Sequence, residues 1–297
     1  MSKITSDMVC SLFDFDFESG IFSVDGVGVT SSTSFPSMLS FLDNKKYLSE
    51  LNSNEAIKVV FVRPEDVNCL RKDIICLQVE DPVWYFFTLL NYLAISKKRE
   101  KTLVSGSAVI HSSAVISDVG VIIGDDVLIE PNVTILQDVE IMSGAIIRAG
   151  AVVGVDGYEH KRTSRGILTV AHDGKVIVSS ESEIGVNSNI VKGFSYRDTI
   201  IGEQTKIDAL VHYAHGVQCG SRCMIVACAM IGGHVTIGDD VWIGPNSTIS
   251  NRVSIGDGAF VTLGSVVVQD VPAGQKVTGN FAIPHMTFIR NLKASAK

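Results

Sequence analysis

The sequence has no surplus of basic residues, because 25 lysines and arginines stand against 32 aspartates and glutamates and leave a net charge of −7. A protein that binds nucleic acid needs a basic stripe that displaces counterions from the phosphates, so we expect no nucleic-acid partner. Long apolar runs are missing too. The longest, residues 83–95, is interrupted by Thr88 and Asn91 and is shorter than the roughly 20 residues that span a bilayer. We therefore expect no transmembrane segment.

Cysteine is scarce, and its spacing does not match the common zinc motifs. None of the six cysteines forms a CxxC pair or lies at a zinc-binding spacing from a histidine. Buried, reduced thiols are the expectation for all of them: Cys10, Cys69, Cys76, Cys219, Cys223 and Cys228. Residues 1–16 carry acidic side chains and lack the apolar stretch of a secretory signal. Together these absences predict a cytoplasmic protein without a metal site.

What the sequence does contain is an aliphatic residue at every sixth position. Twelve positions in steps of six follow this rule without a slip, and ten of them are Ile or Val: Ile201, Ile207, Tyr213, Cys219, Ile225, Ile231, Ile237, Ile243, Ile249, Ile255, Val261 and Val267. Earlier blocks repeat the rule over residues 123–153 and 178–190, and three hexads lead in from residue 104. Such a fixed period is typical of a repeat architecture.

A period of six fits neither the 3.6-residue turn of a helix nor the two-residue alternation of a strand. It fits a triangular coil whose three flat sides hold six residues each, so that one coil takes 18 residues and residues 201–272 form four coils. Parallel ladders between coils would satisfy the backbone, and the stacked aliphatic side chains would form a dry core. The period does not fix the handedness of the coil.

The remaining segments complete a three-part division of the chain. Residues 1–100 lack the hexad and read as a small α/β domain, with strands at 57–62 and 74–79 and a helix that starts at Asp81-Pro82. Residues 101–272 form the β-helix, and residues 273–297 form a tail with a short helix over 286–292. The charged segment 97–101 reads as a solvated linker. A polar interruption at 154–176 is long enough to suggest a functional loop.

His215 is the best candidate for chemistry. In an 18-residue coil it faces outward and stacks with Gly233 one coil later and with Asn251 two coils later. A neutral imidazole accepts a proton from an attacking amine near pH 7, and a glycine amide about 4.8 Å away donates to the oxyanion. Asp208 either holds the imidazole tautomer or caps a corner turn. Outward histidines are more often merely solvated, and we interpret His212 and His234 as solvated or as packed in an interface.

Several runs resemble the UDP-3-O-acylglucosamine N-acyltransferase family. They are RDTIIG at 197–202, KID at 206–208, AHGV at 214–217, and GVDGY at 154–158, with Asp208 and His215 seven residues apart as in the family pattern. The resemblance implies left-handed coils and a homotrimer with active sites at the seams between subunits. It also implies transfer of an acyl chain from acyl carrier protein to a sugar amine, with His215 and Asp208 as the catalytic pair.

The resemblance extends to the N-terminal domain. LSFLDNKKY at 39–47 is similar to the uridine-binding stretch of the family. This implies that Phe41 and Tyr47 sandwich the uracil ring and that Asn44 hydrogen-bonds its edge, since aromatic faces stack on bases and an amide reads a pyrimidine edge. Composition alone favours the other interpretation, in which Phe41 and Tyr47 are ordinary core residues.

Some positions depart from the family pattern. Ala209 replaces the usual Asn after the motif Asp, Arg252 replaces a second functional His, and the C-terminal extension is short. We assign Asn251 and Arg252 to substrate binding. The expected activity is N-acylation of a UDP-linked amino sugar, in lipid A or surface polysaccharide synthesis, with acyl carrier protein or coenzyme A as thioester donor and no permanently bound cofactor. The alternatives are an acetyl-CoA-dependent O-acetyltransferase and a non-catalytic or metal-binding β-helix trimer.

Overall fold

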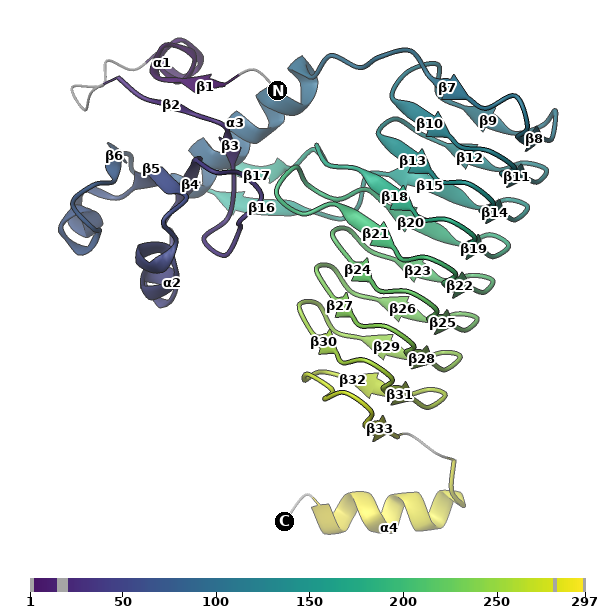
Figure 1. The fold of residues 1–297 in the computed structure, drawn as a ribbon. Helices are drawn as coiled ribbons and strands as arrows, with labels where there is room; N and C mark the ends of the chain where they lie inside the picture. The colour runs from purple at the N-terminus through teal and green to yellow at the C-terminus, as the bar shows by residue number, and fades with distance from the viewer. Residues whose placement is uncertain (1–2, 15–20, 280–281, 296–297) are drawn as a thin grey trace.

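The computed structural model describes residues 3–14, 21–279 and 282–295, which form an α/β part followed by a long parallel β-helix (Figure 1). The α/β part lies beside the upper coils, and the last helix, α4 (His285–Ser295), lies beyond the final coil. This helix is longer than the one expected at residues 286–292. Within the described residues no helix is both long and apolar enough to cross a membrane.

The α/β part is built on a four-stranded parallel sheet in the order β3-β4-β5-β6. Its strands are β3 (Gly26–Val27), β4 (Met38–Phe41), β5 (Ile57–Val62) and β6 (Ile75–Gln78), and a separate antiparallel pair joins β1 (Ile4–Thr5) to β2 (Ser23–Val24). The helices are α1 (Ser6–Phe13), α2 (Leu48–Ser53) and α3 (Pro82–Ser96), with 3-10 turns η1 (Lys45–Tyr47) and η2 (Pro64–Cys69). The two expected strands and the expected helix are therefore present.

Helix α3 starts where its sequence predicts. The Asp81 carboxylate accepts a hydrogen bond of 3.0 Å from the amide of Trp84, and Pro82 occupies the first turn, where no amide is needed. Phe86 and Leu90 on the inner face of the helix are fully buried against Phe61 and Leu77 of the sheet. Burial of each such side chain contributes about 1.5–3 kcal/mol, which fixes α3 on the sheet.

Three parallel sheets form the sides of the β-helix. The first sheet holds β7 (Leu103–Val104), β10 (Val121–Ile123), β13 (Val139–Ile141), β18 (Val176–Val178), β21 (Thr199–Ile201), β24 (Gln218–Cys219), β27 (Thr236–Ile237) and β30 (Ser254–Ile255). The second holds β8 (Val109–Ile110), β11 (Leu128–Ile129), β14 (Ile146–Ile147), β19 (Glu183–Ile184), β22 (Lys206–Ile207), β25 (Met224–Ile225), β28 (Trp242–Ile243), β31 (Phe260–Val261) and β33 (Lys276–Val277). The third holds β9 (Val115–Ile116), β12 (Thr134–Ile135), β15 (Val152–Val155), β20 (Asn189–Val191), β23 (His212–Tyr213), β26 (Met230–Ile231), β29 (Thr248–Ile249) and β32 (Val266–Val267).

The register of these sheets confirms the 18-residue coil. Cys219 pairs with Ile237, which in turn pairs with Ile255, so each hexad position meets its counterpart one coil later. The aliphatic columns are buried along the axis. Tyr213 occupies one of these inward positions and satisfies its hydroxyl by donating to the carbonyl of Ile200 at 2.7 Å. The parallel ladder extends to β33, so the repeat continues beyond residue 272, where the sequence had predicted its end.

Only part of the charged segment after α3 is the solvated linker that its composition predicts, because Lys98, Glu100 and Lys101 are exposed but Lys97 and Arg99 are half-buried. Lys97 Nζ lies 3.0 Å from one carboxylate oxygen of Asp138, and Arg99 Nη2 lies 2.8 Å from the other. The Asp138 carboxylate is only 5% exposed, so it would be costly to bury without these cations. The pairs therefore fasten the start of the β-helix to its third coil. Among the cysteines, Cys219 and Cys223 are buried but Cys228 is exposed, contrary to expectation.

Candidate functional site

Both interruptions of the hexad leave the β-helix at one corner, between the third and first sheets. Residues 156–175 connect β15 to β18, and residues 192–198 connect β20 to β21. His215 follows β23 at the same corner one coil later. The two segments that interrupt the repeat therefore lie directly beside the candidate base, His215.

The imidazole of His215 lies against Gly233, as the 18-residue stacking requires. A Cβ atom on Gly233 would lie 2.6 Å from Cε1 and 2.7 Å from Nε2 of the ring. No side chain fits there, because real Cβ contacts do not approach that closely. The His215 ring can therefore pack on the next coil only because residue 233 is glycine.

The amide N–H of Gly233 makes no hydrogen bond among the described residues. Some corner amides elsewhere in the helix are bound by carboxylates one coil away. The amide of Asp239 donates to Asp257 Oδ1 at 2.9 Å, and the amide of Ala227 donates to Asp208 Oδ2 at 3.2 Å. Gly233 therefore presents a free donor beside the imidazole, which suits stabilisation of an oxyanion.

His215 is more covered than its outward-facing position predicts. Its side chain is 13% exposed, and it makes edge-to-face contacts with three other rings. The ring centroids lie 5.5 Å from His172, 5.4 Å from Phe194 and 4.9 Å from His234. His234 is not simply solvated, because it stacks on Phe194 and Tyr196. Its packing in an interface stays a prediction. The two connecting segments thus form a cover over the corner.

The first connecting segment folds as a hairpin that reaches helix α3 (Figure 1). It consists of β16 (His160–Thr163) and β17 (Gly166–Thr169), paired antiparallel. Asn91 of α3 donates to the carbonyl of Thr169 at 2.8 Å and accepts from the amide of Ala171 at 2.8 Å. At the hairpin turn the amide of Ser164 donates to the Asp81 carboxylate at 2.6 Å. These bonds hold the hairpin between the α/β part and the β-helix.

Sequence reasoning missed one residue at the site, Glu159. Its Oε2 lies 3.4 Å from His215 Nε2, and its Oε1 pairs with the ammonium of Lys161. The Lys161 ammonium also lies over the Phe87 ring, 4.6 Å from its centroid. The only signal in the sequence is an acid at the start of the polar interruption, because its placement depends on how the hairpin docks on α3.

Burial keeps the three histidines of the corner neutral. It lowers the pKa of His172 to about 4 and that of His234 to about 3. Burial also lowers the pKa of His215, while the Glu159 carboxylate raises it and the charges of Lys161, His212 and Arg252 lower it. A neutral imidazole at pH 7 is the form that accepts a proton.

Two ring nitrogens at the corner are buried without a hydrogen-bond partner among the described residues, Nδ1 of His172 and Nδ1 of His215. His172 Nε2 accepts a hydrogen bond of 3.3 Å from the amide of Gly157, so in the neutral ring the proton is on Nδ1. An unsatisfied buried group of this kind costs about 1–3 kcal/mol. Such orphaned groups are unusual in a folded interior, where a water molecule or a ligand normally completes their hydrogen bonds.

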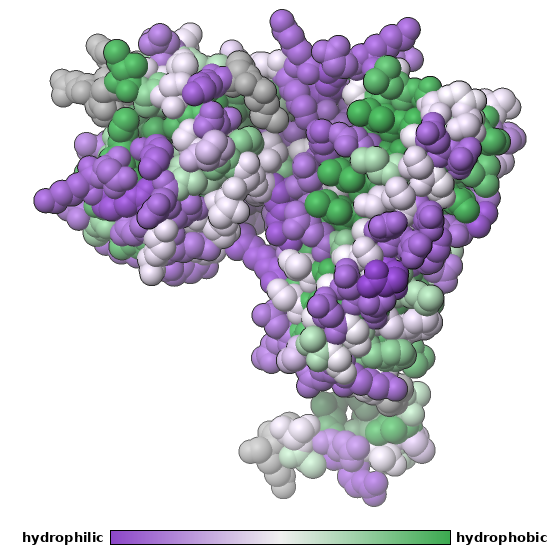
Figure 2. Space-filling model, in the orientation of Figure 1, coloured by the Kyte–Doolittle hydropathy of each residue, from purple (hydrophilic) through white to green (hydrophobic). Residues whose placement is uncertain are grey.

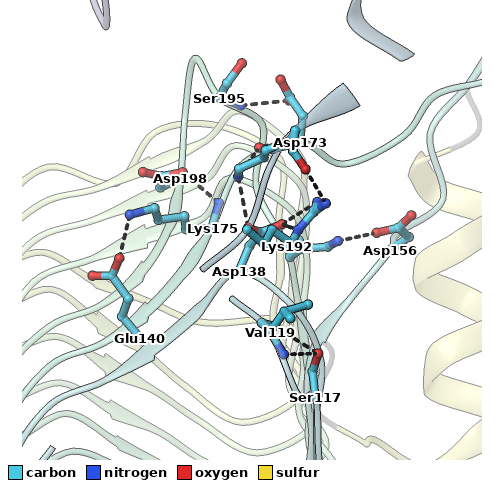
Figure 3. Close-up of polar contacts among 12 residues, drawn as sticks. Ser117, Val119, Asp138, Glu140, Asp156, Asp173, Lys175, Lys192, Ser195 and Asp198 are labelled. Atoms are coloured by element: carbon cyan, nitrogen blue, oxygen red, sulfur yellow. Dashed lines mark hydrogen bonds and ion pairs between the residues drawn. The ribbon is translucent and has the colours of Figure 1, made fainter. Parts of the chain in front are cut away.

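A charged network anchors both ends of the cover (Figure 3). Lys192 Nζ lies 3.0 Å from the Asp156 carboxylate, at the start of the first segment. At its end, Asp173 accepts a hydrogen bond of 2.8 Å from the amide of Ser195, which belongs to the second segment. Burial raises the pKa of Asp173. The two segments are therefore tied to each other as well as to the β-helix.

Asp208 does not reach His215 within one chain. It lies at the corner between the second and third sheets, is exposed, and accepts hydrogen bonds from the amides of Ala209 at 2.7 Å and Ala227 at 3.2 Å. This is the corner-capping role that the sequence left open. A contact between Asp208 and His215 of another subunit stays a prediction.

The residues expected to hold uridine lie at the carboxyl end of β4. Phe41 packs on Phe86, with ring centroids 4.6 Å apart, and belongs to the apolar cluster of α3. Tyr47 is half-buried against a different cluster. Asn44 caps η1 by accepting from the amide of Lys46 at 3.0 Å. The uracil sandwich between Phe41 and Tyr47 therefore stays a prediction.

The structure does bring Tyr47 together with Arg252. Lys46 lowers the pKa of the Tyr47 hydroxyl, and the nearby positive charge of Arg252 lowers it further. Arg252 and Asn251 are exposed and stand at the His215 corner, one coil beyond Gly233, where the amide of Arg252 donates to the carbonyl of Gly233 at 2.9 Å. Substrate residues predicted in two distant parts of the sequence thus lie beside one corner.

Comparison with known proteins agrees with this architecture. A family model described as bacterial transferase hexapeptide (six repeats) matches residues 120–154 and 234–268. The UDP-3-O-acylglucosamine N-acyltransferase of Methylorubrum extorquens (strain PA1) is 37% identical over 145 residues, which cover 49% of this chain and 41% of that protein. The enzyme of the same name from Methylobacterium nodulans is 40% identical over 140 residues, 47% of this chain and 40% of that protein.

The aligned part thus spans about two fifths of the length of these curated relatives. Among solved structures, a UDP-N-acetylglucosamine acyltransferase from Campylobacter jejuni matches at 24% identity with a TM-score of 0.46, over 63% of this chain and 77% of that one. The chain therefore has the hexapeptide repeat in a parallel β-helix that follows an N-terminal α/β part, as expected from its sequence, and it is similar to UDP-3-O-acylglucosamine N-acyltransferases over about half of its length. The left hand of the coil stays a prediction.

Proposed function

We propose that the protein is an N-acyltransferase that moves an acyl group from a thioester to the amine of a UDP-linked amino sugar. The observation that carries this proposal is the neutral imidazole of His215 resting on Gly233, whose amide donor is free. The homology to UDP-3-O-acylglucosamine N-acyltransferases supports both the chemistry and the acceptor class. The donor is acyl carrier protein or coenzyme A, and the product serves lipid A or surface polysaccharide synthesis.

In the proposed reaction the sugar amine attacks the thioester carbonyl, and His215 accepts the proton that the nitrogen loses. Negative charge develops on the carbonyl oxygen, where the Gly233 amide donates a hydrogen bond. The C–S bond then breaks, and the departing thiolate recovers the proton from the imidazolium. The burial that lowers the pKa of His215 keeps the imidazole unprotonated before the reaction.

The acceptor extends from the corner toward the α/β part. Arg252 is exposed beside Tyr47, and a guanidinium is well suited to the diphosphate of a UDP-sugar. Phe41, Asn44 and Tyr47 then hold the uridine, and Asn251 contacts the sugar. Such donors and acceptors imply a cytoplasmic location.

We also propose a homotrimer. The first coils expose apolar side chains on all three sides of the β-helix, Leu103 and Ile122 on the first sheet, Val109 on the second and Val115 on the third. Figure 2 shows apolar side chains on the upper coils, and exposed apolar surface is typical of an interface between proteins. In the trimer Asp208 of one subunit would face the His215 corner of another.

The test is to incubate the protein with a panel of UDP-amino sugars and acyl thioesters and to identify products by mass spectrometry. An amide product is expected, and H215A should lower its rate by about 10²–10⁴-fold, the usual contribution of a general base. E203Q, which removes an exposed charge at the corner between the first and second sheets, should leave the rate unchanged. An ester product would favour the O-acetyltransferase alternative. Metal analysis of the purified protein tests the metal-trimer alternative, in which histidines of different subunits meet across a seam; within one chain the described residues contain no group of three or more His, Cys, Asp or Glu side chains that could hold a metal ion.

A further inference from the structure

We propose that Glu159 is the positioning residue for His215: its carboxylate holds the proton on Nε2, so that Nδ1 is the nitrogen with the free electron pair. The catalytic consequence of this assignment rests on the proposed function. The assignment of the tautomer does not, because it concerns the resting protein alone.

The geometry favours one tautomer of the neutral ring. Glu159 Oε2 lies 3.4 Å from His215 Nε2, and both side chains are largely shielded from water, at 19% and 13% exposure. A carboxylate is only an acceptor, so an N–H at Nε2 is attracted and an electron pair there is repelled. Nδ1 has no described partner that would favour a proton on it. The carboxylate therefore decides where the proton lies.

Glu159 is held by the hairpin rather than by the β-helix. Its carbonyl accepts a hydrogen bond of 2.9 Å from the amide of Val170, and its second carboxylate oxygen pairs with Lys161. Asn91 fixes the same hairpin on α3 through Thr169 and the residue that follows Val170. An orienting group needs this kind of support, because a loosely held carboxylate does not hold a ring in one tautomer.

Asp208, the carboxylate that the sequence motif suggests, is engaged elsewhere in the chain. Both of its oxygens accept corner amides, from Ala209 and Ala227. In the described structure, Glu159 is the carboxylate recorded in an ion-pair contact with His215. The interruption at 154–176 therefore supplies a carboxylate that the repeat itself does not supply.

The other charged or titratable groups around His215 do not replace this role. Lys161 on the hairpin, Arg252 on the corner and His212 on β23 all lower the pKa of His215, and burial, the largest effect, lowers it too. The rings of His172 and His234 are themselves neutral at pH 7, since their pKa values are about 4 and about 3. Removal of the Glu159 charge should therefore lower the pKa of His215 further.

The experiment is nitrogen-15 NMR of the protein with nitrogen-15-labelled histidine. The His215 signals are identified as those that disappear in H215Q. In the neutral wild type we expect Nε2 to be protonated and Nδ1 to be unprotonated. E159A should populate the other tautomer, and E159Q should lower the pKa of His215. E203Q removes an exposed charge at a different corner and should change neither property.

Three results would overturn the proposal: protonation of Nδ1 in the wild type, a His215 spectrum that E159A and E159Q leave unchanged, or a tautomer that changes with D208N instead. Far-ultraviolet circular dichroism shows whether each variant folds, and E159D, which keeps the charge, should retain the wild-type tautomer.

A kinetic measurement separates this proposal from the proposed function. If N-acylation is found, E159A should lower kcat by about 10- to 10³-fold with KM changed less than twofold, and E159D should recover part of the loss. This is less than the roughly 10⁴-fold of a fully buried triad carboxylate, because Glu159 is partly exposed and shared with Lys161. If no acylation is found, the NMR result still decides the tautomer. Unchanged kcat in E159A would contradict the positioning role.

Discussion

The ring of His215 occupies the volume that a side chain on Gly233 would need, one coil further along the β-helix. Replacement of Gly233 by alanine tests this contact. G233A places a methyl group 2.6 Å from Cε1, so the imidazole must leave its resting place. We expect a loss of about 1–3 kcal/mol in the free energy of unfolding, typical of overpacking, and a large fall in acyl transfer.

The matched control for G233A is G106A. A Cβ on Gly106 meets no atom within 4 Å, and its backbone does not adopt a positive φ. Urea denaturation should show little change for G106A, and activity should remain. If G233A behaved like G106A in both measurements, the ring would have an alternative place of equal energy, and the stacked arrangement would not be required for function.

The hexads made the β-helix predictable because each inward position is repeated and its side chain is buried by its own copies. Asp81 was predictable for a similar reason, since a capping residue acts on amides within its own turn. Glu159 was not predictable from sequence. Its contact with His215 depends on a hairpin that docks on a helix far away in the chain. The stacking of His234 was not predictable either, because its partners, Phe194 and Tyr196, come from a connecting segment without periodicity.

The buried ring of His172 leads to a prediction of how the free energy of unfolding changes with pH. Its pKa is about 4 in the folded protein against an ordinary 6.5, because the ring is buried. Between pH 6.5 and 4 the unfolded chain binds a proton that the folded chain does not, so stability falls as the pH falls through this window and is fully present above it. H172Q removes the titrating group, so its stability should fall less than that of the wild type between pH 7 and pH 4.5.

Urea midpoints at the two pH values measure this difference. The difference between the two proteins is expected to be of the order of 2–3 kcal/mol, from the linkage of about 1.4 kcal/mol per unit of pKa. H160Q serves as control, because His160 is exposed on the hairpin. An equal loss of stability in H172Q and in the wild type would show that His172 titrates normally and is not buried as described.

The last prediction concerns Asp138, whose ion pairs attach the end of α3 to the β-helix. The Asp138 carboxylate is 5% exposed and binds both Lys97 and Arg99. D138N removes the charge and leaves two cations facing a neutral amide, although asparagine tolerates the positive φ of 64° at this corner. Because both cations keep some access to water, we expect the free energy of unfolding to fall by about 2 kcal/mol rather than by the full cost of a broken buried pair.

D126N is the matched control for this change, since Asp126 is exposed and has a similar φ of 55°. Urea denaturation should show a lower midpoint for D138N and little change for D126N. Hydrogen exchange should locate the effect, with faster exchange in residues 97–104 of D138N. Equal midpoints for the two variants would mean that the Asp138 pairs contribute no more than surface ion pairs, and that the hairpin contacts of α3 are enough to hold the α/β part in place.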